Sequence, residues 1–119
     1  MEKALWYLLA GTRGGPNRVR LIRAIADWPR NANQLAEHVG LDYNTVRHHL
    51  DMLLEHDVVE RSGEEYGALY FLTDRFERHR ETFEQITERM DVEAAAAGAE
   101  SEPDPGSTGD GSADAETED

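Results

Sequence analysis

The fold is decided by the stretch NQLAEHVGLDYNTVRHHLDML, which occupies positions 33–53. We predict a first helix over Gln34–Val39, because its apolar residues recur at helical spacing and Gly40 follows as a stop signal. Asp42 is placed to cap a second helix over Tyr43–His56, where apolar residues again recur at helical spacing. Two helices joined by a short turn that contains glycine are the signature of a helix-turn-helix motif.

A β-hairpin is expected directly after this motif. Val58–Arg61 and Leu69–Leu72 are rich in residues that favour strands, and the loop between them contains glycine. A hairpin in this position is a wing. The predicted fold is therefore mainly α with a small β-hairpin, a winged helix-turn-helix.

Three further helices flank the motif and the wing. Lys3–Ala10 is strongly apolar, and Arg18–Trp28 is a helix that opens at Pro16 or Asn17. A last helix is expected from Asp74, as its cap, to about Met90. The helix over Arg18–Trp28 is expected to bury one face, made of Val19, Ile22, Ile25 and Ala26.

The first and the last helix are expected to form the interface of a homodimer. In the last helix, apolar residues seven apart make a coiled-coil-like seam on an otherwise polar surface. The rest of the chain offers too few apolar residues to cover both this seam and the first helix, so a partner subunit is the simplest cover. The predicted interface residues are Leu5, Leu8, Leu9, Phe76, Phe83, Ile86 and Met90.

The negative charge of the chain is concentrated at its C-terminal end. The formal net charge is −13, but residues 91–119 hold ten acidic residues and no Lys or Arg. Residues 1–90 then carry 15 acidic against 12 basic residues, a net charge of −3. We predict one domain over residues 1–91 and a disordered acidic tail over residues 92–119, because the tail has no aromatic residue and little apolar surface to bury.

Composition also narrows the class of protein. The absence of cysteine excludes disulfides and thiolate metal sites. No run approaches the roughly 20 apolar residues of a membrane helix, and the N-terminus lacks a secretory signal pattern, so we expect a cytoplasmic protein. Eleven arginines stand against one lysine in an acidic chain, which suggests the salt-rich cytosol of a halophilic archaeon. No catalytic or metal-ligand motif is present, so neither an enzyme nor a cofactor is expected.

These motifs carry a family resemblance. The pairs Leu35-Ala36, Gly40-Leu41, Thr45-Val46 and His49-Leu50, followed by Leu53, resemble the winged helix-turn-helix regulators of the ArsR-like group, and their haloarchaeal members in particular. The resemblance covers roughly residues 16–73. It implies DNA binding and dimerisation. The metal sensors of that group use cysteine clusters, which this chain lacks, so thiolate metal sensing is not implied.

In a helix-turn-helix, the second helix enters the major groove of DNA. If the apolar positions of Tyr43–His56 are buried, its polar residues face outward. Arg47 is the first candidate for a base contact, since arginine matches guanine, and Asn44 is the second, since asparagine matches adenine. The other candidates on this helix are Tyr43, Thr45 and His48.

Phosphate contacts are expected from elements beside this helix. Asn33 and Gln34 open the first motif helix, and either Asn31 or Asn33 caps it. Arg18 follows a glycine-rich loop, which binds phosphate or merely connects two helices in a tight turn. Arg61 lies on the wing, although the two glutamates at the wing tip, positions 64 and 65, would be repelled by phosphate.

The prediction is a dimeric, sequence-specific regulator of transcription that binds an inverted-repeat site on double-stranded DNA. Repression by blocking polymerase is the simplest mechanism, and activation remains open. Two alternatives stand beside it. One is a winged-helix module that binds protein instead of DNA, and the other is a regulator that responds to a small-molecule effector.

Overall fold

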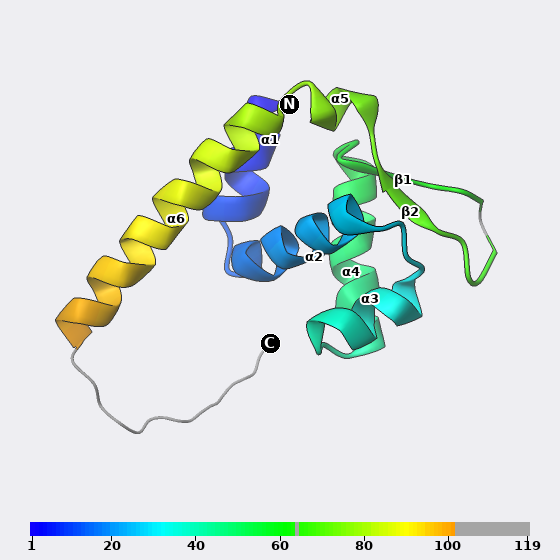
Figure 1. Cartoon of the computed structure of the whole chain (residues 1–119), viewed down its shortest axis with the longest axis horizontal. Coiled ribbons are helices and arrows are strands. Elements are labelled where there is room, and N and C mark those ends of the chain that lie inside the picture. The colour runs from blue at the N-terminus through cyan, green and yellow to red at the C-terminus, as the bar shows by residue number, and fades with distance from the viewer. Residues whose placement is uncertain (64, 102–119) are drawn as a thin grey trace. The chain divides into compact units, whose positions relative to one another are not determined.

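A computed structural model describes residues 1–63 and 65–101 of the chain, so position 64 at the wing tip and positions 102–119 of the predicted tail lie outside the described residues. The predicted fold class is confirmed: the described part is mainly helical with one two-stranded antiparallel hairpin (Figure 1). Its elements are α1 (Glu2–Leu5), a π-helix (Trp6–Ala10), α2 (Gly15–Asp27), α3 (Ala32–Val39), α4 (Tyr43–Glu55), β1 (Val59–Arg61), β2 (Tyr70–Leu72), α5 (Asp74–Glu77) and α6 (Arg80–Ser101).

The helix-turn-helix forms as predicted, because each of its ends has a local signal. Asn31 and Gln34 make a capping box at the start of α3: the Asn31 side chain accepts from the Gln34 amide at 2.8 Å, and the Gln34 side chain accepts from the Asn31 amide at 2.9 Å. Gly40 ends α3 in the left-handed region, at φ +75°. Asp42 then caps α4 by accepting from the Thr45 amide at 2.9 Å.

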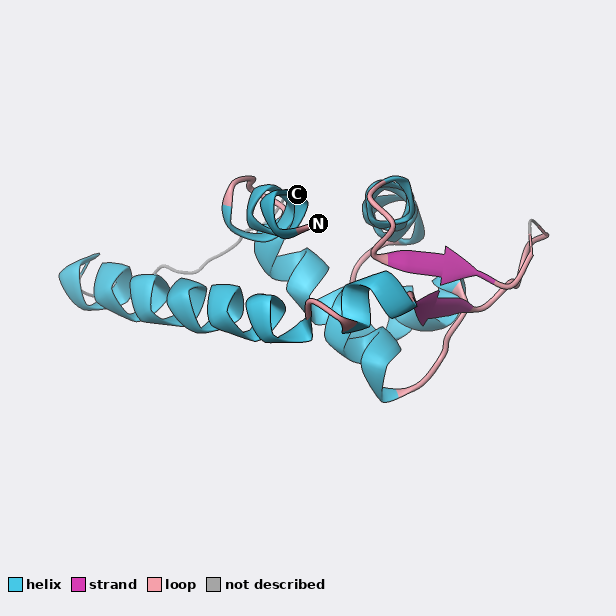
Figure 2. Ribbon diagram, turned by 90° about the horizontal axis from the view of Figure 1, so that it is seen from above, coloured by secondary structure: helices cyan, strands magenta, loops and turns pink. Residues whose placement is uncertain are grey.

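The wing pairs in a short antiparallel register and is tied to the helices by one further strand-like contact. Val59 lies opposite Leu72, and Arg61 opposite Tyr70. The Tyr70 amide also donates to the carbonyl of Arg30 at 2.9 Å, so the segment after α2 pairs with β2. Figure 2 shows the hairpin projecting beyond the helices. No local sequence pattern predicts the bridge between Arg30 and Tyr70, because it joins residues far apart in the chain.

The buried face of α2 differs from the prediction. Its largest buried side chains are Arg18, Leu21, Ile22 and Ile25, which follow the i, i+3, i+4, i+7 pattern, and the small Ala24 is buried beside them. Val19 is only half-buried and Ala26 is exposed, so placing these two in the core was wrong. The observed buried face is rotated around the helix relative to the predicted one, because the charged Arg18 is part of it.

The predicted single helix from Asp74 to Met90 is wrong at both ends and in the middle. Thr73 is the cap, since its hydroxyl accepts from the Phe76 amide at 3.0 Å. The helix breaks between α5 and α6, and α6 continues to Ser101. The break lets the rings of Phe76 and Phe83 meet edge to face, with centroids 5.4 Å apart.

The predicted dimer interface is, for the most part, the core of the single chain. Six of its residues are between 0 and 1% exposed within one chain, and Met90 is half-buried. Phe83 is covered from α2, where the Arg23 guanidinium lies 5.2 Å from its ring centroid. These six side chains therefore need no partner subunit to cover them. The corrected residues are Leu5, Leu8, Leu9, Phe76, Phe83 and Ile86.

The chain divides into two units, Met1–Ile86 and Thr87–Asp119. In the second unit, α6 runs on to Ser101, so the prediction of disorder is wrong for residues 92–101. Four consecutive alanines, residues 94–97, explain the helix, because alanine has the highest helix propensity. The domain boundary after residue 91 stays a prediction.

Candidate nucleic-acid interface

The outward face of α4 is a stripe of polar side chains. Val46, His49, Leu50 and Leu53 are buried, which fixes the direction of the core. The exposed positions on the opposite side follow the i, i+4, i+7, i+11 pattern. Its first half offers an amide and an imidazole, and its second half offers two carboxylates that a phosphate would repel. The stripe consists of Asn44, His48, Asp51 and Glu55.

Arg47 lies on the flank of α4 that faces the wing. Its Nη1 donates to the Tyr43 hydroxyl at 3.0 Å, and its guanidinium carbon lies 5.9 Å from the centre of the Tyr43 ring. Asp51 is 4.0 Å from its Nη2. The hydrogen bond to Tyr43 raises the pKa of Arg47 above its ordinary value, and Tyr70 and Asp51 add smaller contributions. The side chain is therefore held beside the outward stripe and not on it.

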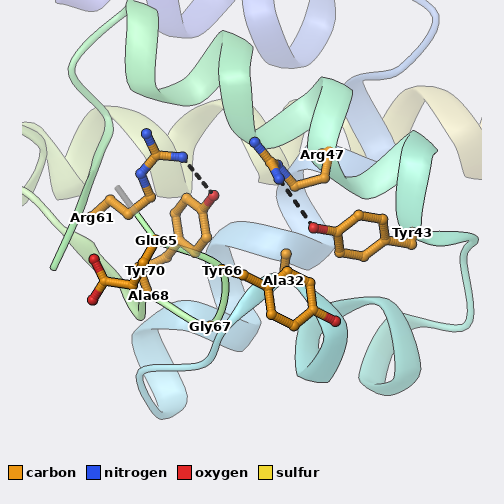
Figure 3. Close-up of a pocket in the computed structure, with 9 residues that line it drawn as sticks. All are labelled: Ala32, Tyr43, Arg47, Arg61, Glu65, Tyr66, Gly67, Ala68 and Tyr70. Carbon is orange, nitrogen blue, oxygen red and sulfur yellow. Dashed lines mark hydrogen bonds between the residues drawn. The ribbon is translucent and has the colours of Figure 1, made fainter. Parts of the chain in front are cut away.

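Between α4 and the wing is a hollow of about 160 Å³ (Figure 3). Arg61 enters it from β1 and donates to the Tyr70 hydroxyl at 3.4 Å. Figure 3 shows the guanidinium groups of Arg47 and Arg61 on the same side of this hollow, each bonded to a different tyrosine. The lining residues are Ala32, Tyr43, Arg47, Arg61, Glu65, Tyr66, Gly67, Ala68 and Tyr70.

Tyr66 links the wing loop to the start of both motif helices. Its hydroxyl accepts a hydrogen bond from Asn33 Nδ2 on α3, and its ring centroid lies 6.4 Å from that of Tyr43 on α4. Asn33 and Gln34 are exposed, as a phosphate contact requires, although the Gln34 carbonyl oxygen is engaged in the helix cap. The sequence placed Tyr66 on the wing but gave no sign of this long-range contact.

The predicted phosphate contact by Arg18 is wrong, because Arg18 is a core residue with 4% of its surface exposed. Its Nη1 donates to the Leu8 carbonyl and to the Thr12 hydroxyl, both at 2.6 Å. Its Nη2 lies 3.2 Å from Met52 Sδ. Burial lowers the pKa of Arg18 below its ordinary value. Arg18 therefore joins the π-helix, the following loop and α4.

The glycine-rich loop before α2 serves close packing. A Cβ added to Gly15 would lie 1.7 Å from the carbonyl oxygen of Leu9, far inside van der Waals contact. Only glycine lets α2 begin this close to the π-helix. The geometry therefore favours the interpretation of this loop as a connector over a phosphate site.

His49 occupies the core side of α4, where it faces Arg18 from α2. It is 6% exposed, and its Nδ1 has no hydrogen-bond partner among the described residues. The pKa of His49 is lowered to about 4, mainly by burial, with smaller contributions from the charges of Arg18 and His48. The folded protein therefore favours neutral His49.

This predicts a loss of stability in mild acid. The folded pKa lies below the unfolded value, so the stabilisation is complete above about pH 6.5 and is lost as the pH falls towards 4. We expect the free energy of unfolding to fall by about 2 kcal/mol between pH 7 and pH 5, measured by urea denaturation. His49→Gln should remove most of this loss, and the exposed His38→Gln should not. An equal slope in all three proteins would contradict the prediction.

Among the described residues, no group of three or more His, Asp or Glu side chains is arranged to hold a metal ion. None of the helices in that part of the chain combines the length and the apolar character needed to cross a membrane.

Comparison with known proteins agrees with this geometry. Residues 15–61, from the start of α2 to the end of β1, match the family described as "Bacterial regulatory protein, arsR family". This segment contains both motif helices and the first strand of the wing. The chain is thus similar to a family of winged helix DNA-binding regulators of transcription. No curated protein sequence matches it.

Several solved structures share the fold. RV1404 from Mycobacterium tuberculosis is 21% identical with a TM-score of 0.50, and the match covers 76% of this chain and 60% of that one. Staphylococcus aureus MarR in complex with salicylate and kanamycin is 18% identical with a TM-score of 0.52, covering 75% and 60%. A protein with unknown function from Listeria innocua is 23% identical with a TM-score of 0.50, covering 82% and 78%. The chain thus spans about 60% of the length of the first two proteins.

Proposed function

We propose that the protein regulates transcription by binding a specific site on double-stranded DNA, with α4 in the major groove. The observation that carries the proposal is the exposed first half of α4, where Asn44 and His48 stand on the outward stripe. The N-terminal residues of a recognition helix are those that reach base edges. The family match over residues 15–61 supports the same function.

Five polar residues of the two motif helices have a proposed role. Asn44 is suited to pair with adenine, and His48 to donate to a base or a phosphate. Thr45 stands at the edge of the stripe, where its methyl group suits thymine. Asn33 and Gln34 position the protein through phosphates without reading sequence.

We further propose that the protein acts as a homodimer, as a repressor, and on an inverted repeat. Two recognition helices in successive major grooves would then lie about 34 Å apart. Since the leucines of α1 and the π-helix are buried within one chain, the contact between subunits would use outer residues such as Tyr7, which is 53% exposed. A site occupied by two chains per duplex is the stoichiometry that this proposal requires.

The amino-acid composition favours a protein that functions at high salt concentration. With eleven arginines, one lysine and a net charge of −13, the chain fits the cytosol of a halophilic archaeon. At about 1 M salt the Debye length is roughly 3 Å, so the negative total would hardly repel DNA. The same salt weakens phosphate contacts, which leaves base contacts as a larger share of the affinity.

The proposal is tested by binding to a duplex enriched from a random pool, measured by fluorescence anisotropy in KCl. We expect saturable binding with two chains per duplex and a clear preference over a scrambled duplex. Asn44→Ala should weaken binding to the enriched duplex by about 1–3 kcal/mol, because one bidentate base contact is lost. Gln85→Ala, which removes an exposed amide from α6, is the matched control and should bind as the wild type does.

A second candidate function is a winged-helix module that binds protein. It is favoured by Trp28, which is 68% exposed at the end of α2, and by the carboxylates on the second half of the α4 stripe. Failure to enrich any duplex across the whole range of salt would favour this candidate. A response to a small-molecule effector stays a prediction.

A further inference from the structure

We propose that Arg47 binds a backbone phosphate of the DNA in the hollow between α4 and the wing, and does not read a base. The inference rests on the proposed function and assigns a ligand group to one part of the interface. It replaces the sequence-based prediction that Arg47 is the first base-reading residue. The assignment comes from the direction of the side chain and from the groups around it.

The direction of Arg47 follows from its place on the helix. Successive residues of a helix turn by about 100°, so Arg47, three residues after Asn44, lies about 60° to one side of it, at the edge of the stripe next to the wing. On this flank, Arg47 is fixed by the 3.0 Å hydrogen bond to the Tyr43 hydroxyl and by the contact with the Tyr43 ring. A base contact would require this arrangement to be broken. A phosphate at the edge of the groove would not.

The hollow has the chemistry of an oxyanion site. Arg47 presents a guanidinium that is held in place by the Tyr43 hydroxyl, and the Tyr70 hydroxyl also lines the hollow. Arg61 adds a second guanidinium from the wing (Figure 3). Guanidinium groups form paired, charge-assisted hydrogen bonds with phosphate oxygens.

Two carboxylates near the hollow would repel a phosphate, and they allow a second test of the inference. Glu65 lines the hollow, and Asp51 lies 4.0 Å from Arg47 Nη2 with its side chain 62% exposed. An ion pair this exposed contributes little and is readily exchanged for a phosphate. Neutralising Glu65 should therefore strengthen DNA binding of every sequence, because it removes repulsion at a phosphate site.

The experiment compares full-length Arg47→Gln with the wild type on the enriched and the scrambled duplex, from 0.1 to 1 M KCl. Arg78→Gln is the matched control, because Arg78 is exposed and directly follows α5. Figure 1 shows α5 near one end of α4 and α3 near the other end. We expect Arg47→Gln to weaken binding to both duplexes by the same factor, about tenfold at 0.1 M. The slope of log affinity against log salt should become shallower by about 0.9, so the deficit shrinks about eightfold by 1 M. Glu65→Gln should strengthen binding to both duplexes, and thermal melting confirms that each variant is folded.

The contrary results are distinct from one another. If Arg47→Gln reduces the preference for the enriched duplex and leaves the slope unchanged, Arg47 reads a base and the inference is overturned while the proposed function stands. If it behaves as Arg78→Gln does, Arg47 touches no DNA and the inference is again overturned. If the wild type itself shows no preference between duplexes, the proposed function and the inference fall together.

Discussion

Phe83→Ala is expected to lower the free energy of unfolding by about 3–5 kcal/mol. Phe83 is 1% exposed in the single chain, where it meets Phe76 edge to face at 5.4 Å and lies under the Arg23 guanidinium at 5.2 Å. Removing the ring leaves a cavity between α2, α5 and α6, and it also removes an aromatic pair worth about 1 kcal/mol beyond its buried area. The loss of stability should therefore occur within each single chain and not at a contact between subunits.

The measurement is urea denaturation at two protein concentrations that differ by a hundredfold. The loss should be the same at both, since a core residue acts within one chain. Tyr7→Ala, which removes an exposed ring from the π-helix, is the control and should change the stability of the protomer much less. A small loss that depends on concentration would restore the sequence-based interpretation of Phe83 as an interface residue.

Gly15→Ala is expected to destabilise the fold by about 3 kcal/mol, the upper end of the range for overpacking. The added Cβ would lie 1.7 Å from the Leu9 carbonyl oxygen, and the conflicting atom is backbone that cannot rotate away. The start of α2 and the π-helix would have to separate, and the bond from Arg18 to the Leu8 carbonyl would be disturbed with them.

Gly40→Ala separates this steric effect from backbone strain. Gly40 has a φ of +75° and nothing within 4 Å of an added Cβ, so alanine there meets strain alone, about 1–2 kcal/mol. The melting temperature of Gly15→Ala should be lower than that of Gly40→Ala. The reverse order would show that α2 does not begin as close to the π-helix as the structure has it.

The helix-turn-helix was predictable because its signals are local. Asn31 and Gln34 are three residues apart, Gly40 and Asp42 lie within one turn, and each acts on the backbone beside it. Periodicity within α4 then separates the buried from the outward side. The exposure of Asn44 and His48 follows from the same periodicity.

The errors concern contacts between residues distant in sequence. Arg18 occupies the first position of an apolar stripe, and its acceptor on Leu8 is ten residues away, so its charge suggested a surface role. The spacing of Phe76 and Phe83 predicts one uninterrupted helix, because the apolar pattern carries no sign of the break between α5 and α6. That Arg47 contacts a base stays a prediction from residue type, and its place beside the wing is a long-range feature that the sequence does not reveal.

An NMR titration of the ¹⁵N-labelled chain with the enriched duplex tests whether the first half of α4 reads DNA. We expect the largest chemical-shift changes at Asn44, Thr45 and His48, with smaller changes at Asn33, Gln34 and the wing. Shifts confined to the surface around Trp28, with α4 unaffected, would contradict this expectation.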